Sequence, residues 1–247
     1  MDADLRVNAL YLSSRLRSRL ADAARCPVTT IIAPTGYGKT TAAQYLQRRI
    51  AAEAPDAHVF RQFLSGGGRQ EFWTGLCRAL HTAPQLSAQL LALGYPDSPH
   101  TRQQLLELVQ DALPAQSPVW FILDDVHLLQ GGEAAELVSF LAERLPLQVH
   151  LLLLSRNQIF SEAQKLRLGS RLLELSAADL RLTQEELAQY AGLCGLPLPE
   201  RESQALLSVS EGWIAMVYLI FRAYAQTGTW RFDTKGMDTL IEQVMFE

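Results

Sequence analysis

The loop-like segment Ala33-Pro34-Thr35-Gly36-Tyr37-Gly38-Lys39-Thr40-Thr41 constrains the fold of this chain more than any other feature. It follows the β-branched run 28–32 and precedes a stretch, residues 40–52, whose pattern indicates a helix. Glycines between a strand and a helix let successive backbone N–H groups converge on an anion, and the helix N-terminus adds its positive end. Lys39 supplies a charge for the β- and γ-phosphates of a nucleotide, and Thr40 presents a hydroxyl to Mg²⁺.

One position departs from the usual phosphate-binding pattern G-x-x-x-x-G-K-[ST]. Ala33 stands where the first glycine belongs. The alternative interpretation is an ordinary strand-to-helix turn. The residues Gly38 to Thr41, in their place between a strand and a helix, favour phosphate binding over that alternative.

Apolar runs typical of strands alternate with helical stretches over the first 180 residues. Strand candidates are 28–32, 58–64, 119–123, 149–154 and 171–175, and helix candidates are 40–52, 71–81, 102–113 and 131–145. This alternation predicts an α/β fold with a mostly parallel sheet and helices on both faces. Together with the loop at 33–41, it indicates a fold of the P-loop NTPase type. After residue 180 the strand pattern stops. Thr183 and Glu186 there form a capping box, which indicates the start of a small helical module.

The pattern predicts three regions. Residues 1–180 are a P-loop nucleotide-binding domain, 181–235 are a small helical subdomain, and 236–247 begin a following region. The stretch 237–247 reads as a helix without a C-cap signal. We therefore expect the chain to be part of a longer protein.

Charged side chains follow two of the predicted buried strands. Asp124 and Asp125 end the run 119–123, and two acids there are costly unless they face a cation or a donor. We assign Asp124 to Mg²⁺ and Asp125 to activation of the attacking water. Arg156 follows the run 149–154 and is predicted to lie on the same edge of the sheet, where it can reach a γ-phosphate. The alternative for Arg156 is a solvated loop arginine.

The composition restricts the possible partners. The formal net charge is −4, and residues 51–247 carry fourteen basic and twenty-three acidic side chains. Nucleic-acid binding usually needs a basic face, so we expect this chain not to bind nucleic acid. The first 50 residues have a local excess of arginine at positions 15, 17, 19 and 25. This excess is either a solvated helix face or a segment that faces phosphate.

Sequence features also bear on location. The three cysteines, Cys26, Cys77 and Cys194, are far apart and form no metal-ligand or disulfide pattern, which favours a reducing compartment. The longest apolar runs are too short to span a bilayer, and the first residues are acidic where a signal peptide is basic. We expect a cytoplasmic protein without membrane contact.

Taken in order, these segments resemble the large ATP-binding LuxR-type regulators, which belong to the STAND class of signal-transducing P-loop NTPases. The resemblance rests on the segments 33–41, 124–127, 154–156, 173–175, 180–186 and 211–213, and on Arg15 with its neighbouring leucines before the loop. It extends over nearly the whole chain. The family also accepts a small residue in place of the first loop glycine.

The resemblance implies an ATP-dependent switch. ADP holds a closed monomer, and an inducer together with ATP favours an open form that self-associates and activates transcription. The family's pattern implies that Lys39, Thr40 and Thr41 bind phosphates and that Arg156 reads the γ-phosphate. It implies further that the turn at Gly212 and Trp213 covers the adenine.

The chain departs from the pattern at two places. Residues 65–69 replace an acidic segment of the family, and Ile214 stands where other STAND proteins have proline. Ile214 still offers an apolar contact to a base. The DNA-binding and sensor regions of the family have no counterpart within these 247 residues.

Three functions remain to be compared. The first is a nucleotide switch, a slow ATPase, within a bacterial signal-responsive transcription regulator. The second is an ATP-driven remodelling protein of the AAA+ kind, which normally supplies an arginine in trans and forms a ring. The third is an interaction domain with a vestigial nucleotide site. Lys39, Thr40, Asp124 and Asp125 argue against the third.

Overall fold

A computed structural model describes residues 10–112, 117–129, 131–230 and 232. The chain divides into two compact units, which we describe separately. The sheet unit comprises residues 19–32 and 42–175, and the loop–helix unit comprises the described parts of 1–18, 33–41 and 176–247. The region predicted to begin at residue 236 lies outside the described residues.

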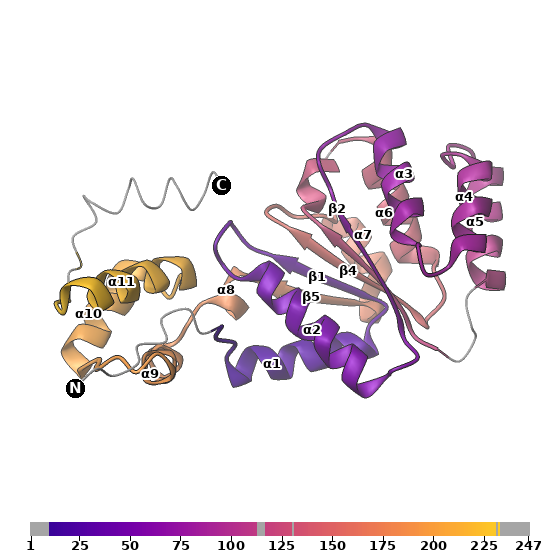
Figure 1. Cartoon of the computed structure of the whole chain (residues 1–247). Helices are drawn as coiled ribbons and strands as arrows, with labels where there is room; N and C mark the ends of the chain where they lie inside the picture. Colours follow the sequence, from indigo (N-terminus) through magenta and orange to yellow (C-terminus); the bar gives the residue numbers. More distant parts are fainter. Residues whose placement is uncertain (1–9, 113–116, 130, 231, 233–247) are drawn as a thin grey trace. The chain divides into compact units, whose positions relative to one another are not determined.

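A five-stranded sheet forms the centre of the sheet unit (Figure 1). Its strands are β1 (Val28–Ile32), β2 (His58–Phe63), β3 (Val119–Asp124), β4 (Val149–Ser155) and β5 (Leu172–Ser176). They lie in the order β2-β3-β4-β1-β5, and the pairs β1–β4, β3–β4 and β2–β3 are parallel. β3 and β4 are buried along their whole length, as expected for central strands of a sheet that is covered on both faces. The predicted α/β class and parallel sheet are confirmed.

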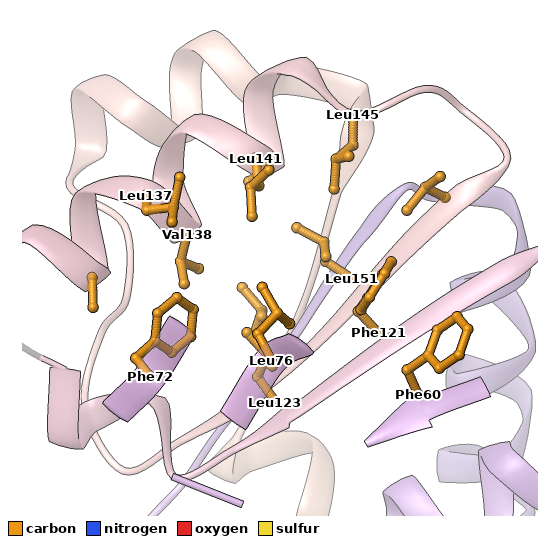
Figure 2. Close-up of a cluster of buried hydrophobic side chains, with 14 of the residues drawn as sticks. Phe60, Phe72, Leu76, Phe121, Leu123, Leu137, Val138, Leu141, Leu145 and Leu151 are labelled. Carbon is orange, nitrogen blue, oxygen red and sulfur yellow. The ribbon is translucent and has the colours of Figure 1, made fainter. Parts of the chain in front are cut away.

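Helices cover both faces of this sheet. α2 (Lys39–Glu53) lies on one face, and α3 (Arg69–Ala79) and α6 (Glu133–Arg144) lie on the other (Figure 1). The main core lies between the sheet and α3 and α6. Figure 2 shows Leu141 of α6 directed toward the side chains that fill this space, among them Leu123 and Leu151 of the strands and Leu76 of α3. The remaining helices of this unit are α4 (Pro84–Leu93), α5 (Pro99–Ala112) and α7 (Glu162–Leu168).

The loop–helix unit has a core of its own. It contains the start of α1 (Ser14–Ala21), then α8 (Ala177–Leu180), α9 (Gln184–Leu193), α10 (Glu200–Ser210) and α11 (Ile214–Thr227). The buried side chains include Leu187, Tyr190, Leu206, Val217 and Phe221. Tyr11 stacks on Tyr190 with ring centroids 5.2 Å apart, which ties the segment before α1 to α9.

The predicted capping box at the start of α9 is confirmed. The Thr183 hydroxyl accepts a hydrogen bond from the Glu186 N–H at 3.3 Å, and Glu186 Oε2 accepts one from the Thr183 N–H at 2.9 Å. Two backbone N–H groups that no helical carbonyl can reach are thereby satisfied.

Some helix boundaries differ from the prediction. α5 begins at Pro99 rather than at residue 102, because proline is well suited to the first position of a helix and Ser98 caps it through the Thr101 N–H. α4 was not predicted, and it also begins at a proline, Pro84. None of the helices in the described part of the chain has the length and apolar character that a bilayer span requires.

Candidate nucleotide-binding site

The loop after β1 has the backbone geometry that its glycines allow. Gly36 and Gly38 have φ angles of 78° and 84°, in the left-handed region that other residues rarely occupy. A Cβ at Gly36 would lie 2.8 Å from both the Ala215 Cβ and the Trp213 Nε1. Gly36 is therefore required both by its backbone conformation and by the close approach of α11.

Lys39 is the first residue of α2 and is only 8% exposed. Its Nζ donates hydrogen bonds to the backbone oxygens of Ala33 at 2.6 Å and Pro34 at 2.9 Å. The ammonium group thus lies inside the curve of the loop, among its carbonyl groups. Thr40 and Thr41 follow in the first turn of α2, where backbone N–H groups have no helical partner.

A cavity of about 290 Å³ lies within the loop–helix unit, next to this loop. Three parts of the unit line this cavity: the segment that leads into α1, the loop with the start of α2, and the helical module. Their lining residues are Leu10, Tyr11, Leu12, Ser13 and Leu16, then Gly36, Tyr37, Gly38 and Thr41, and finally Leu180, Leu182, Tyr190, Ile214, Ala215 and Tyr218. Most of these side chains are apolar or aromatic. Such a lining suits the flat, largely apolar surface of a nucleobase. Four loop residues of the predicted site and Ile214 meet at this cavity.

Trp213 and Gly212 have other contacts. The Trp213 Nε1 donates a hydrogen bond to the Thr35 backbone oxygen at 3.2 Å, and its ring lies 6.2 Å from that of Tyr37. Gly212 has a φ of 75°, and a Cβ there would lie 2.4 Å from the Leu182 backbone oxygen. The turn therefore contacts the loop through Trp213, while Ile214 lines the cavity.

Arg15 is bonded to the capping box of α9. Its Nε lies 3.0 Å from Glu186 Oε1, and one Nη donates to the Arg181 backbone oxygen at 2.8 Å. Burial raises the pKa of Glu186, but hydrogen bonds from Arg15, Thr183 and Ser13 outweigh burial and lower it overall. In this structure Arg15 fixes the segment before the loop to α9.

In the sheet unit, two acids stand at the end of β3. Asp124 is 3% exposed, and its Oδ1 accepts a hydrogen bond from the Asp125 N–H at 3.1 Å. Asp125 has a φ of 61°, a conformation that aspartate tolerates better than most residues. Its Oδ1 lies 3.7 Å from Nδ1 of His127. The side chains of Asp124 and Asp125 therefore differ in surroundings, one buried and one half-exposed.

One residue at this place was not predicted from the sequence. Arg61 of β2 donates from Nη2 to Asp124 Oδ2 at 2.9 Å. Phe63 is paired with Asp124 across the two strands, so Arg61, two residues earlier, is on the same face of the sheet as Phe63. The sequence does place a charged residue, Arg61, within the strand candidate 58–64. It does not show that this strand lies beside the strand that ends at Asp124, so the pair could not be predicted.

Arg156 directly follows β4 and is exposed. Ser155, the last residue of the strand, is buried, and its hydroxyl donates to the Asn157 backbone oxygen at 2.6 Å. Since β1, β3 and β4 are parallel neighbours, their carboxyl ends lie at one edge of the sheet. The expected position of Arg156 on the same edge as Asp124 follows from this order.

The carboxylates at the end of β3 suit a metal ion that binds together with a nucleotide. Among the described residues, no group of three or more His, Cys, Asp or Glu side chains is placed to hold a metal ion. Mg²⁺ typically binds through one or two carboxylates together with substrate phosphates and water. A single buried carboxylate, Asp124, at the carboxyl edge of the sheet suits that mode.

Comparisons with known proteins agree with this fold. The chain is 26% identical over 230 residues to the HTH-type transcriptional regulator MalT of Serratia proteamaculans, a match that covers 91% of this chain and 25% of that protein. It is 27% identical over 227 residues to MalT of Yersinia enterocolitica, covering 87% of this chain and 24% of that protein. The chain thus spans about a quarter of the length of these relatives. The predicted resemblance to this group of regulators is confirmed.

Solved structures show the same fold at low sequence identity. A STAND protein with a tetratricopeptide repeat sensor from Pyrococcus horikoshii is 17% identical, with a TM-score of 0.62, over 95% of this chain and 32% of that one. A Walker-type ATPase from Pyrococcus abyssi is 12% identical, with a TM-score of 0.61, over 99% of this chain and 76% of that one.

A match to a family model shows which protein family the chain belongs to. The model of the AAA domain matches residues 22–155, which include β1, the glycine-containing loop at 33–41, β3 with its two acids, and β4. This match covers more than half of the 247 residues. The chain therefore belongs to the AAA domain family of P-loop ATPases.

Proposed function

We propose that this chain binds ATP and ADP with Mg²⁺ and is the nucleotide-dependent switch module of a bacterial transcription regulator. The main support is the loop–helix unit, where the buried Lys39 follows a loop whose left-handed Gly36 and Gly38 line an apolar cavity. A cation within a glycine loop suits phosphates, and an apolar cavity suits a base.

The proposed phosphate contacts come from the loop. The phosphates would be bound by the backbone N–H groups of residues 35–39, which follow Pro34, and by the ammonium group of Lys39. Thr40 and Thr41 would add contacts at the N-terminus of α2. Lys39 would exchange its bonds to the Ala33 and Pro34 oxygens for bonds to phosphate. On the base side, Ile214 and the aromatic lining of the cavity would contact the adenine. Arg15 and the turn of Gly212 and Trp213 would hold this lining in place.

The proposed metal and γ-phosphate contacts come from the strand ends. Asp124, with the Thr40 hydroxyl, would bind Mg²⁺, which offsets the negative charge of the phosphates. Asp125 would orient and deprotonate the attacking water, and Arg156 would contact the γ-phosphate. A contact made only with the triphosphate distinguishes ATP from ADP, which is what a switch requires.

We propose slow hydrolysis, since the same residues that bind the nucleotide would also support its cleavage. As domains, we propose residues 1–180 and 181–235, because the five strands of the described sheet end by residue 176. The two compact units divide the chain differently, since the described part of 1–18 and residues 33–41 belong to the unit of the helical module. We also propose a further region from 236 onward. The relatives are named transcriptional regulators, so we propose that DNA binding, inducer binding and self-association belong to regions beyond this chain, in a cytoplasmic protein.

A second candidate is an ATP-driven remodelling protein, which the AAA domain match favours. The two functions predict different assembly states for this chain. A remodeller would form a ring with ATP, whereas a switch module would stay monomeric with ADP. Size-exclusion chromatography with light scattering, in ADP and in a non-hydrolysable ATP analogue, distinguishes the two.

The decisive experiment is to identify the nucleotide that co-purifies with the protein, by mass spectrometry after denaturation. ADP or ATP at near one equivalent supports the proposal. Calorimetry on the nucleotide-free protein then gives the affinities of both nucleotides. If no nucleotide co-purifies and calorimetry detects no binding of either one with Mg²⁺, the proposal is wrong.

A further inference from the structure

Arg61 is partly buried and lies beside the carboxylate of Asp124, within the sheet unit. Its Nη2 lies 2.9 Å from Asp124 Oδ2, and the two side chains are 16% and 5% exposed. A carboxylate removed from water to this degree is costly unless a positive group compensates its charge. Arg61 supplies such a group from the neighbouring strand.

The position of Arg61 is fixed by its own strand. Phe63 is paired with Asp124 across β2 and β3, and Arg61 shares the face of Phe63. The guanidinium carbon of Arg61 lies 4.4 Å from the centre of the Phe63 ring, a favourable cation–π distance. Phe63 itself is 66% exposed, so this contact covers the guanidinium group from the solvent side. The ring directs the guanidinium along the strand toward Asp124.

Both oxygens of Asp124 accept hydrogen bonds. Oδ2 accepts from Arg61, and Oδ1 accepts from the Asp125 N–H at 3.1 Å. A cation that approaches Asp124 therefore meets a full positive charge on one side and an N–H dipole on the other. Like charges near one carboxylate disfavour each other, most strongly where water is excluded.

We propose that Arg61 is a positioning residue that competes with Mg²⁺ for Asp124, so that the metal binds only together with the negative charge of a nucleotide. The inference rests on the proposed function, because it takes Asp124 as the carboxylate that faces Mg²⁺. In the absence of nucleotide, Arg61 keeps the carboxylate oriented and its charge compensated. With nucleotide, the phosphates add the negative charge that lets Mg²⁺ and Arg61 share the site.

The first test is the Mg²⁺ dependence of ADP binding in Arg61→Met, which keeps the length of the side chain and removes its charge. Calorimetry measures the ADP affinity over a series of Mg²⁺ concentrations, with the affinity in EDTA as the reference of each variant. The half-maximal Mg²⁺ concentration should fall about fivefold to tenfold in Arg61→Met, since the competing charge is gone. An unchanged or higher Mg²⁺ requirement would overturn the inference.

Arg69→Met is the matched control. Arg69 is also paired with a carboxylate, that of Glu133 at 2.8 Å, and also lies over an aromatic ring, that of Tyr95 at 5.4 Å. Both partners of this pair are exposed and belong to α3 and α6. Arg69→Met should keep the wild-type Mg²⁺ requirement. An equal shift in both variants would show a general charge effect and contradict the proposal.

A second measurement needs neither nucleotide nor metal. Thermal unfolding in EDTA compares Arg61→Met, Asp124→Asn and the double variant. Arg61→Met alone should lower the melting temperature, and adding Asp124→Asn should restore part of the loss, because the buried charge is removed. Additive losses would contradict a direct charge pair. If Arg61→Met does not fold, Arg61→Lys should keep a Mg²⁺ requirement near that of the wild type.

The outcomes separate this inference from the proposed function. A wild-type protein that binds no ADP at any Mg²⁺ concentration contradicts the proposed function itself. A wild-type protein that binds ADP with Mg²⁺, together with an Arg61→Met variant of identical Mg²⁺ dependence, contradicts only the role of Arg61.

Discussion

The indole Nε1 of Trp213 donates a hydrogen bond to the backbone oxygen of Thr35, 3.2 Å away and 178 positions earlier in the chain. This bond joins the turn before α11 to the glycine-containing loop at 33–41. Gly36, the next residue of the loop, leaves room for it, since a Cβ at Gly36 would lie 2.8 Å from the same nitrogen. The shape of the loop and the start of α11 therefore depend on each other.

Gly36→Ala should destabilise the loop–helix unit. The substitution places a Cβ at a φ of 78° and forces it against Trp213 and Ala215. The left-handed backbone costs about 1–2 kcal/mol and the overlap about 1–3 kcal/mol more in the free energy of unfolding. Chemical denaturation measures the loss.

Gly228→Ala is the control for Gly36→Ala. Gly228 has a similar φ of 67°, but no heavy atom lies within 4 Å of the position that a Cβ would take there. Its loss should be confined to the backbone contribution, about 1–2 kcal/mol. Equal losses of unfolding free energy in the two variants would show that the close approach of Trp213 and Ala215 to Gly36 does not add to the cost of the substitution.

Lys39→Ala should remove most of the affinity for ADP. The charge-assisted contact of a buried ammonium group with phosphate contributes about 2–3 kcal/mol, which corresponds to roughly 30-fold to 150-fold in affinity. Calorimetry compares the variant with wild type. Lys165→Ala is the control, since Lys165 pairs with Glu162 and Glu174 instead. Unchanged ADP affinity in Lys39→Ala would reject the loop as the phosphate site.

The sequence was sufficient for those features that depend on local order. The loop at 33–41 lies between a strand and a helix, and the capping box of Thr183 and Glu186 needs only a spacing of three residues. The parallel sheet followed from the alternation of strands and helices. In each case, residues close in the chain carry the physical signal.

Contacts between distant segments could not be predicted in this way. Arg61 meets Asp124 only because β2 lies beside β3, and strand order is not a local property. The same holds for Trp213 and Thr35. α7 was missed for another reason: Ser161 and Gln164 form a capping box that was present in the sequence, but the helix that follows is only seven residues long.

His150 should make the stability of the sheet unit depend on pH. Its ring stacks on Trp120 with centroids 4.2 Å apart, and its Nδ1 is 3.1 Å from the Cys26 backbone oxygen. Burial lowers the pKa of His150 below its ordinary value of 6.5, against the opposing effect of that hydrogen bond. The unfolded chain therefore takes up a proton more readily. The contribution of neutral His150 to the free energy of unfolding is therefore fully present above pH 6.5. It is lost as the pH decreases toward and through the pKa of His150 in the folded protein.

Thermal unfolding between pH 7.5 and about 5 tests this dependence, in the range where histidine titrates. His150→Phe keeps an aromatic ring beside Trp120 and removes the titration, so its melting temperature should fall less steeply with pH than that of wild type. His81→Gln, at an exposed position, should keep the wild-type slope. Parallel slopes for wild type and His150→Phe would refute the role of His150.

Arg156→Ala should weaken ATP binding and spare ADP. Arg156 follows β4 at the carboxyl edge of the sheet, where the order β3-β4-β1 also places the ends of β1 and β3. A bond from its guanidinium group to the γ-phosphate exists only with the triphosphate, so the loss should be about 1–3 kcal/mol, or roughly fivefold to 150-fold, for ATP alone.

Hydrolysis should slow in the same variant, because negative charge on the transferred group persists in the transition state. Calorimetry with ADP and a non-hydrolysable ATP analogue, together with single-turnover hydrolysis, measures both effects. Arg167→Ala is the control, since its guanidinium group pairs with Glu143 on the surface and should leave both affinities unchanged. A solvated loop arginine at position 156 predicts no selectivity. Equal losses for the two nucleotides, or no loss for either, would therefore reject Arg156 as the residue that reads the γ-phosphate.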